Sequence, residues 1–127
     1  MNNSKKTVLA RGCDPVLSAE FAKMVPALIG NAKYIPTTND VDFIEKLKTE
    51  KWSVVYFAPG ACRFSAVNQR IPGANEETKA WTLDEYKALI LEHQGPDVPV
   101  VESTEERNSL LLLNDALENA KETLATL

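Results

Sequence analysis

The chain has 127 residues, 44% of them hydrophobic, 25% charged and 7% aromatic, which suits one domain with a hydrophobic core, residues 1–127. Its 14 basic and 18 acidic residues give a net charge of −4, which argues against a nucleic-acid partner. No apolar run approaches the roughly 20 residues of a membrane span, there is no signal-peptide core, and two cysteines do not make a disulfide scaffold, so we expect a cytoplasmic protein without a membrane partner.

The chain begins with a predicted strand and helix. The apolar run Thr7–Ala10 indicates the strand. Asp14 before Pro15 is typical of a helix N-terminus, because an Asp side chain accepts free N–H groups there and Pro is tolerated at the first helical position. We expect Pro26 to kink or shorten this helix, which stops at residues 30–31. Its apolar residues recur at helical spacing: Val16, Leu17, Phe21, Met24, Val25, Leu28 and Ile29.

Two further strands and a helix are expected in the middle of the chain. Lys33–Thr37 predicts an edge strand, because its Pro36 cannot donate to a neighbouring strand. Residues 38–40 offer three N-caps for a helix that follows. The β-branched and aromatic run Trp52–Phe57 is typical of a strand buried on both faces.

The last third begins after a long irregular stretch that ends near Trp81. The segment Thr82–Glu85 is a capping box, and Trp81 and Tyr86 occupy the two positions of a hydrophobic staple, so a helix is expected there with its stop at Gly95. Val98–Glu102 predicts a fourth strand. A second capping box at residues 103–106 predicts a C-terminal helix that runs to the end of the chain.

Strands that alternate with helices imply crossover connections and a parallel sheet with helices on both faces. The strand order 2-1-3-4 places the two most apolar strands in the centre. The sequence therefore predicts a small doubly wound α/β domain, a flavodoxin-like four-stranded parallel sheet.

In such sheets, ligands bind outside the carboxyl ends of the strands where the winding reverses, here between the first and third strands. Residues 58–75 carry two Arg and no acidic residue, which favours a pocket for an anionic or polar small molecule, with Arg63 as its anchor. Asp14 opposes an anion at the start of the first helix, since its side chain would occupy the free N–H groups there itself. The candidate ligand-binding residues are Arg11, Gly12, Asp14, Thr38, Gly60, Arg63, Ser65, Arg70 and Ser103.

Cys13 and Cys62 follow the first and third strands and are the candidate catalytic residues. A thiolate beside Arg at a helix N-terminus could serve phosphoryl, sulfur or acyl transfer in a transferase or hydrolase. The alternatives are a redox-sensitive pair and two small buried side chains.

Cys13, with Ser18 five residues on, is similar in position to the phosphate-accepting cysteine of sugar phosphotransferase enzyme IIB components. That resemblance implies a Gly- and Ser/Thr-rich phosphate loop, but residues 14–17 are Asp-Pro-Val-Leu. Low-molecular-weight tyrosine phosphatases need an Arg six positions after the cysteine, where this chain has Ala19 or Asn68. No family is assigned on these resemblances, which cover the topology and one residue.

His93, the only histidine, lies in the last turn of a predicted helix, where it suits the helix dipole. No metal site and no nucleotide-binding motif is predicted, and no cofactor is inferred. The C-terminal segment Leu110–Leu127 carries leucines and Ala120 at alternating spacings of three and four. This seam predicts the face that covers the sheet and, because the expected helix is longer than the strands, a homodimer or a protein-interaction surface.

Overall fold

The computed structural model describes residues 2–12, 14–58, 73–78, 81–102 and 106–124. The four strands are β1 (Thr7–Arg11), β2 (Lys33–Thr37), β3 (Val54–Phe57) and β4 (Val100–Glu102), all parallel and in the order β2-β1-β3-β4. The helices are α1 (Pro15–Leu28), α2 (Asp40–Thr49), α4 (Leu83–Gln94) and α5 (Glu106–Glu118). The predicted parallel α/β fold and its strand order are confirmed.

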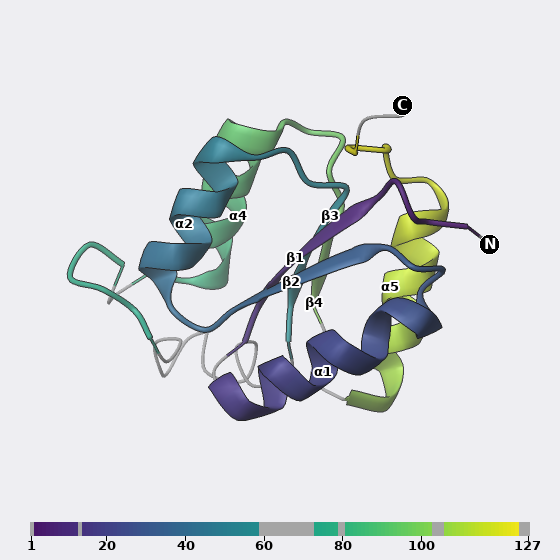
Figure 1. The fold of residues 1–127 in the computed structure, drawn as a ribbon. Helices are drawn as coiled ribbons and strands as arrows, with labels where there is room; N and C mark the ends of the chain where they lie inside the picture. The colour runs from purple at the N-terminus through teal and green to yellow at the C-terminus, as the bar shows by residue number, and fades with distance from the viewer. Residues whose placement is uncertain (1, 13, 59–72, 79–80, 103–105, 125–127) are drawn as a thin grey trace.

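Helices cover both faces of the sheet (Figure 1), and each face has its own core. On one face, α1 and α5 pack through side chains such as Val25 and Leu113 against β1 and β3. On the other, α2 and α4 pack through Phe43 and Tyr86 among others. Because the first crossover, through α1, and the second, through α2, lie on opposite faces, the winding reverses between β1 and β3, which is where a ligand crevice is expected.

The helix starts follow the capping residues in the sequence. Asp14 accepts N–H bonds from Val16 and Leu17, at 2.9 and 3.2 Å, at the start of α1. Thr82 caps α4, and the ring centroids of Trp81 and Tyr86 lie 5.3 Å apart, which confirms the staple. These interactions need only residues that are neighbours in sequence, so the pattern alone was sufficient to predict them.

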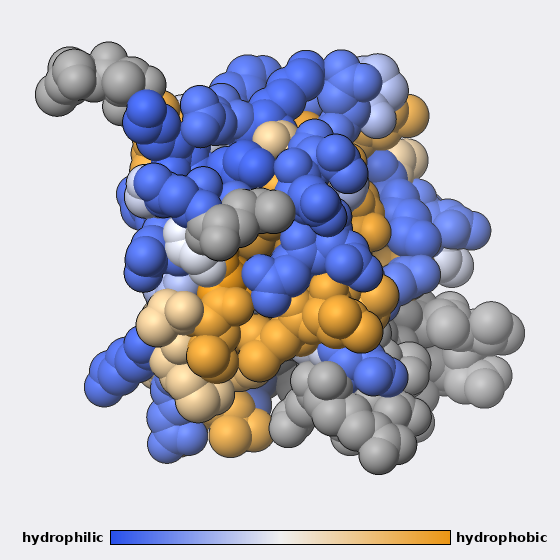
Figure 2. Space-filling model, turned by 90° about the vertical axis from the view of Figure 1, so that its right-hand side faces the viewer, coloured by the Kyte–Doolittle hydropathy of each residue, from blue (hydrophilic) through white to orange (hydrophobic). Residues whose placement is uncertain are grey.

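The apolar stripe predicted for α1 is only half buried. Val25 and the C-cap residue Ile29 are completely buried, and Phe21 is partly buried against Tyr34. Val16, Leu17, Met24 and Leu28 are 49% to 67% exposed. Figure 2 shows apolar side chains gathered in one patch on the side of the molecule that α1 and α5 form. Periodicity predicted the helix, but which apolar side faces the sheet depends on how the helix docks.

The prediction that the last helix runs to the chain end is wrong. Helix α5 has 13 residues and ends at Glu118, where the Lys6 ammonium donates to the Leu117 carbonyl. The chain then returns to the amino ends of the strands, where the Thr123 N–H donates to the Lys5 carbonyl at 2.9 Å. The tail's backbone groups therefore find partners outside a helix, and the surplus helical length that predicted a dimer does not exist.

None of the helices in the described ranges has the length and apolar character needed to cross a membrane.

Candidate functional site at the carboxyl edge of the sheet

The ends of three strands and the first turns of α1 meet at Gly12, directly after β1. A Cβ atom built on Gly12 would lie 2.8 Å from Ser18 Oγ, 3.7 Å from Ala58 Cβ and 4.0 Å from the Thr37 carbonyl oxygen. The Gly12 N–H donates to that carbonyl at 2.8 Å. Glycine thus lets α1 and the end of β3 approach β1 closely at the point where the winding reverses.

Two half-buried hydroxyls lie at this edge of the sheet, those of Ser18, which lies against Gly12, and of Thr38, which directly follows β2. Within the described part of the chain, neither hydroxyl makes a hydrogen bond, whereas the neighbouring Thr37 hydroxyl donates to the Ala10 carbonyl. Ser18 and Thr38 are therefore polar groups with hydrogen-bonding capacity left for a bound molecule.

Arg11, at the end of β1, forms a completely buried ion pair with Asp40 at the start of α2. Its Nε donates to Asp40 Oδ1 at 2.9 Å, and its Nη2 lies 2.9 Å from the same oxygen. Both side chains are 0% exposed. Nη1 donates to the Gly12 carbonyl, so the guanidinium also holds the backbone at the junction.

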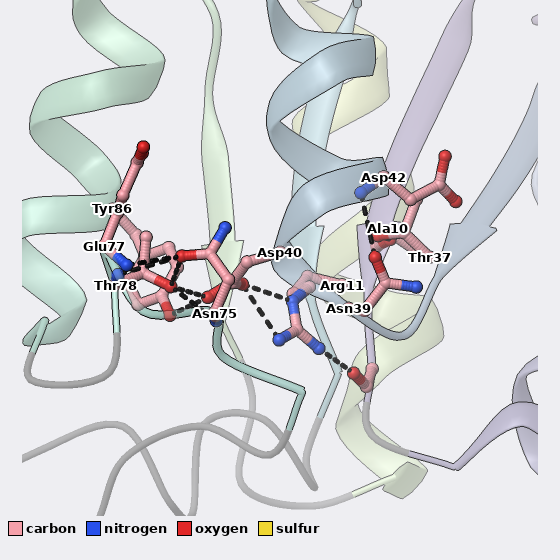
Figure 3. Close-up of polar contacts among 11 residues, drawn as sticks. Ala10, Arg11, Thr37, Asn39, Asp40, Asp42, Asn75, Glu77, Thr78 and Tyr86 are labelled. Atoms are coloured by element: carbon pink, nitrogen blue, oxygen red, sulfur yellow. Dashed lines mark hydrogen bonds and ion pairs between the residues drawn. The ribbon is translucent and has the colours of Figure 1, made fainter.

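The second Asp40 oxygen accepts two hydroxyls from the other side (Figure 3). Tyr86 OH donates to Oδ2 at 2.7 Å, and the Thr78 hydroxyl donates to the same atom. Asp40 therefore joins three distant parts of the chain, the end of β1, residues 73–78 and α4. A buried carboxylate with a counter-ion and two hydroxyl donors is fully satisfied, which is the condition for keeping it charged in the interior.

Residues 73–78 form a turn that is hydrogen-bonded to Asp40. Asn75 Oδ1 accepts the N–H groups of Glu77 and Thr78, each at 3.0 Å, and the Thr78 hydroxyl accepts the Asn75 N–H at 3.1 Å. The Gly73 carbonyl accepts the Asp40 N–H at 3.0 Å. The segment is thus held across the start of α2.

Burial, reinforced by the hydrogen bond to Asp40, raises the pKa of Tyr86 above its usual value. Tyr86 therefore keeps its proton in the folded protein at pH values where the unfolded chain loses it. Its contribution to stability is complete below the unfolded pKa of about 10 and is lost as the pH rises above it.

Tyr86→Phe is expected to lower the free energy of unfolding by about 1.5–3 kcal/mol at pH 7, because a hydrogen bond to a charged acceptor is lost. Above pH 10 its unfolding free energy should fall less steeply with pH than that of the wild type, by about 1.4 kcal/mol per unit. Urea unfolding from pH 7 to 11 measures both effects.

Tyr34→Phe is the matched control, because burial also raises the pKa of Tyr34, whose hydroxyl makes no hydrogen bond in the described chain. It should reduce the alkaline slope with little loss at pH 7. If the two variants lost equal stability at pH 7, the Tyr86–Asp40 bond would contribute nothing.

Four of the predicted site residues lie in the described chain. Gly12 lies at the junction, and Thr38 directly follows β2. Arg11 is paired with Asp40, and Asp14 occupies the N–H groups at the start of α1. The remaining predicted site residues lie outside the described residues: Cys13, Gly60, Cys62, Arg63, Ser65, Arg70 and Ser103.

Sequence reasoning did not identify Asp40 as the partner of Arg11. Asp40 was one of three candidate caps, and the structure assigns the cap to Asn39, whose side chain accepts the Asp42 N–H at 2.9 Å. That leaves Asp40 free to turn inward. A lone basic residue at the end of an apolar strand was the one signal that a buried acidic partner was needed.

Ser18 was considered only as a serine at a fixed distance from Cys13. Its place one turn beyond Asp14, on the side of α1 that meets the end of β1, could be read from helical spacing.

Comparisons of this chain with protein-family models, curated proteins and solved structures find no match.

Proposed function

We propose that the protein binds a small anionic or polar molecule at the carboxyl edge of the sheet, between the ends of β1 and β3. The observation that carries the proposal is the convergence at Gly12, where the winding reverses and the Ser18 hydroxyl lies 2.8 Å from the position of an added Cβ. Doubly wound sheets bind their ligands in this crevice. The hydroxyls of Ser18 and Thr38 supply hydrogen bonds to phosphate, sulfate or carboxylate oxygens.

The cationic anchor is assigned to Arg63 rather than to Arg11. The Arg11 charge is balanced by Asp40, and Asp14 places another negative charge at the start of α1. An anion therefore needs a positive charge from elsewhere, and residues 58–75 carry two Arg without an acidic residue. Arg63 follows Phe57, the last residue of β3, by six positions and Arg70 follows it by thirteen, so Arg63 is closer in sequence to the strand end. An Arg anchor favours phosphate or carboxylate, which it binds with two parallel hydrogen bonds.

The test is an amide NMR titration with inorganic phosphate, sulfate and succinate in separate series. We expect saturable shifts at Gly12, Ser18, Thr38 and Ala58 with at least one of the three anions. Arg63→Ala should weaken that binding ten-fold or more, since charge-assisted hydrogen bonds contribute about 1.5–3 kcal/mol. Ser18→Ala should weaken it about three- to ten-fold.

Ser4→Ala is the control, because Ser4 is an exposed serine before the amino end of β1 and should leave the affinity unchanged. Shifts that gather away from the junction, or equal affinities for Ser4→Ala and Ser18→Ala, would contradict the proposed site.

A further inference from the structure

The Asp14 carboxylate, at the start of α1, uses only one of its two oxygens within the protein. Oδ1 accepts the N–H groups of Val16 and Leu17, at 2.9 and 3.2 Å. In the described part of the chain, Oδ2 accepts no hydrogen bond and the carboxylate forms no ion pair. Asp14 is exposed, so a group from outside the chain can reach it. Because an ionised carboxylate only accepts hydrogen bonds, that group has to be a donor.

Asp14 lies beside the junction at which the ligand is proposed to bind. It follows Gly12 by two positions, and its carbonyl accepts the Ser18 N–H at 2.9 Å, one helical turn further on. Residues four positions apart lie on the same side of a helix, so Asp14 and Ser18 are neighbours there. The Ser18 hydroxyl oxygen lies 2.8 Å from the Cβ position of Gly12. A molecule bound against Gly12 and Ser18 therefore lies next to the Asp14 carboxylate.

The charges at this edge of the sheet suit a ligand that carries both signs. Arg11 and Asp40 neutralise each other, whereas Asp14 has no counter-ion in the described chain. An anionic group beside Asp14 is repelled unless the same molecule also offers a donor to that carboxylate. Residues 58–75 carry two Arg and no acidic residue, and Arg63 is the proposed anchor for the anionic group. An ammonium on the ligand would give Asp14 a charge-assisted hydrogen bond, which is the strong kind.

We propose that the ligand is a zwitterion of the amino-acid class, whose ammonium donates to the Asp14 carboxylate while its carboxylate lies at the Gly12 junction. This inference rests on the proposed function and adds the chemical class of the ligand. Asp14 then has a second task besides capping α1. The Ser18 hydroxyl donates to the ligand's carboxylate, since a hydroxyl is a donor as well as an acceptor. A hydroxyl in place of the ligand's ammonium would be a weaker partner for Asp14, because it carries no charge.

Three four-carbon dicarboxylates that differ only in the group on carbon 2 test the proposal. Succinate carries a hydrogen there, malate a hydroxyl and aspartate an ammonium. Amide NMR titrations of the full chain at pH 7 measure each dissociation constant from the shifts of Gly12, Ser18 and Ala58. We expect aspartate to bind ten-fold or more tighter than succinate, with malate between them, because a charge-assisted hydrogen bond is gained.

Asp14→Asn is expected to change the affinities for two of these ligands in opposite directions. Asn keeps a side-chain oxygen for the N–H groups at the start of α1, so the cap survives without the negative charge. Aspartate should bind about ten-fold more weakly to this variant. Succinate should bind about two- to five-fold more tightly, because the repulsion between like charges is gone. A purely structural effect of the substitution would move both affinities in the same direction.

Asp97→Asn is the matched control, because it removes the same charge from an exposed residue before β4, at the opposite edge of the sheet. It should leave all three affinities unchanged. Succinate binding as tight as that of aspartate, or an Asp14→Asn variant that binds both more weakly, would overturn the amino-acid assignment alone. So would junction shifts with phosphate or sulfate but with none of the three dicarboxylates. If no compound of the five shifted the junction amides, the proposed function would fail as well.

Discussion

Asp40→Ala is expected to lower the free energy of unfolding by about 3–5 kcal/mol, because it leaves the buried Arg11 guanidinium without its counter-ion. Arg11 and Asp40 are both 0% exposed, so water cannot replace the lost carboxylate without opening the edge of the sheet. The same change removes the acceptor for the hydroxyls of Tyr86 and Thr78. Urea unfolding followed by circular dichroism and by tryptophan fluorescence measures the loss.

Asp42→Ala is the matched control, since Asp42 also lies in the first turn of α2 and also forms an ion pair, with Lys46 at 2.6 Å. Those two side chains are 41% and 29% exposed, so the pair should contribute at most about 1 kcal/mol. Both substitutions remove one negative charge from the helix N-terminus. The difference between them therefore reports burial of the pair. Equal losses of unfolding free energy in the two variants would mean that the buried Arg11–Asp40 pair contributes no more to stability than the exposed Asp42–Lys46 pair.

The double variant Arg11→Met, Asp40→Leu separates the energy of the pair from the cost of leaving one charge alone. Replacing both members of a buried ion pair by apolar side chains is often close to neutral. We expect the double variant to be more stable than Asp40→Ala, with a coupling energy of about 1–3 kcal/mol between the two sites. The Tyr86 hydroxyl then keeps no carboxylate partner, which limits the recovery.

Gly73→Ala is expected to lower the free energy of unfolding by about 2–5 kcal/mol. Gly73 has a φ of 83°, which costs an L-residue about 1–2 kcal/mol. An added Cβ would also lie 2.4 Å from the Thr38 carbonyl oxygen and 3.0 Å from Asn39 Cα. Both contacts are backbone atoms, so relief requires the start of α2 to move, at a further cost of about 1–3 kcal/mol.

Gly95→Ala provides the control for the backbone conformation alone. Gly95 ends α4 with a φ of 89°, and nothing lies within 4 Å of its added Cβ. Its ψ of 174° places it in a region that is nearly exclusive to glycine, so its loss should be about 1–3 kcal/mol. Thermal melts and urea unfolding of both variants measure the difference, which isolates the collision at Thr38. A Gly73→Ala variant as stable as Gly95→Ala would show that residues 73–78 move away from α2 without cost.

The Asp40→Ala and Gly73→Ala substitutions act on the same part of the molecule. The ideal Cβ of Gly73 lies 3.2 Å from Arg11 Nη2, so the turn at Gly73 lies against the ion pair. Its carbonyl accepts the Asp40 N–H. Anything that loosens the pair is therefore expected to loosen residues 73–78 as well, and the two variants should be non-additive when combined.

The sequence by itself determined the elements and their order, apart from the end of the last helix. Those inferences depend on local interactions and on periodicity. Asp14, Thr82 and the Trp81–Tyr86 staple act on residues within a turn or two, and the Pro36 strand had to lie at an edge, as β2 does. The parallel order followed because each strand is followed by a crossover helix.

Only the tertiary structure decided which polar side chains pair with one another in the folded protein. Arg11 and Asp40 are 29 positions apart, and Asp40 and Tyr86 are 46 apart, so no spacing rule relates them. Likewise, the sequence patterns of α1 and α5 are those of ordinary amphipathic helices. Only the packing of these helices on the sheet buries Val25 and Leu113 and leaves Leu17, Met24 and Leu111 exposed. Pairing and burial depend on which surfaces meet after folding, and a one-dimensional pattern does not contain those distances.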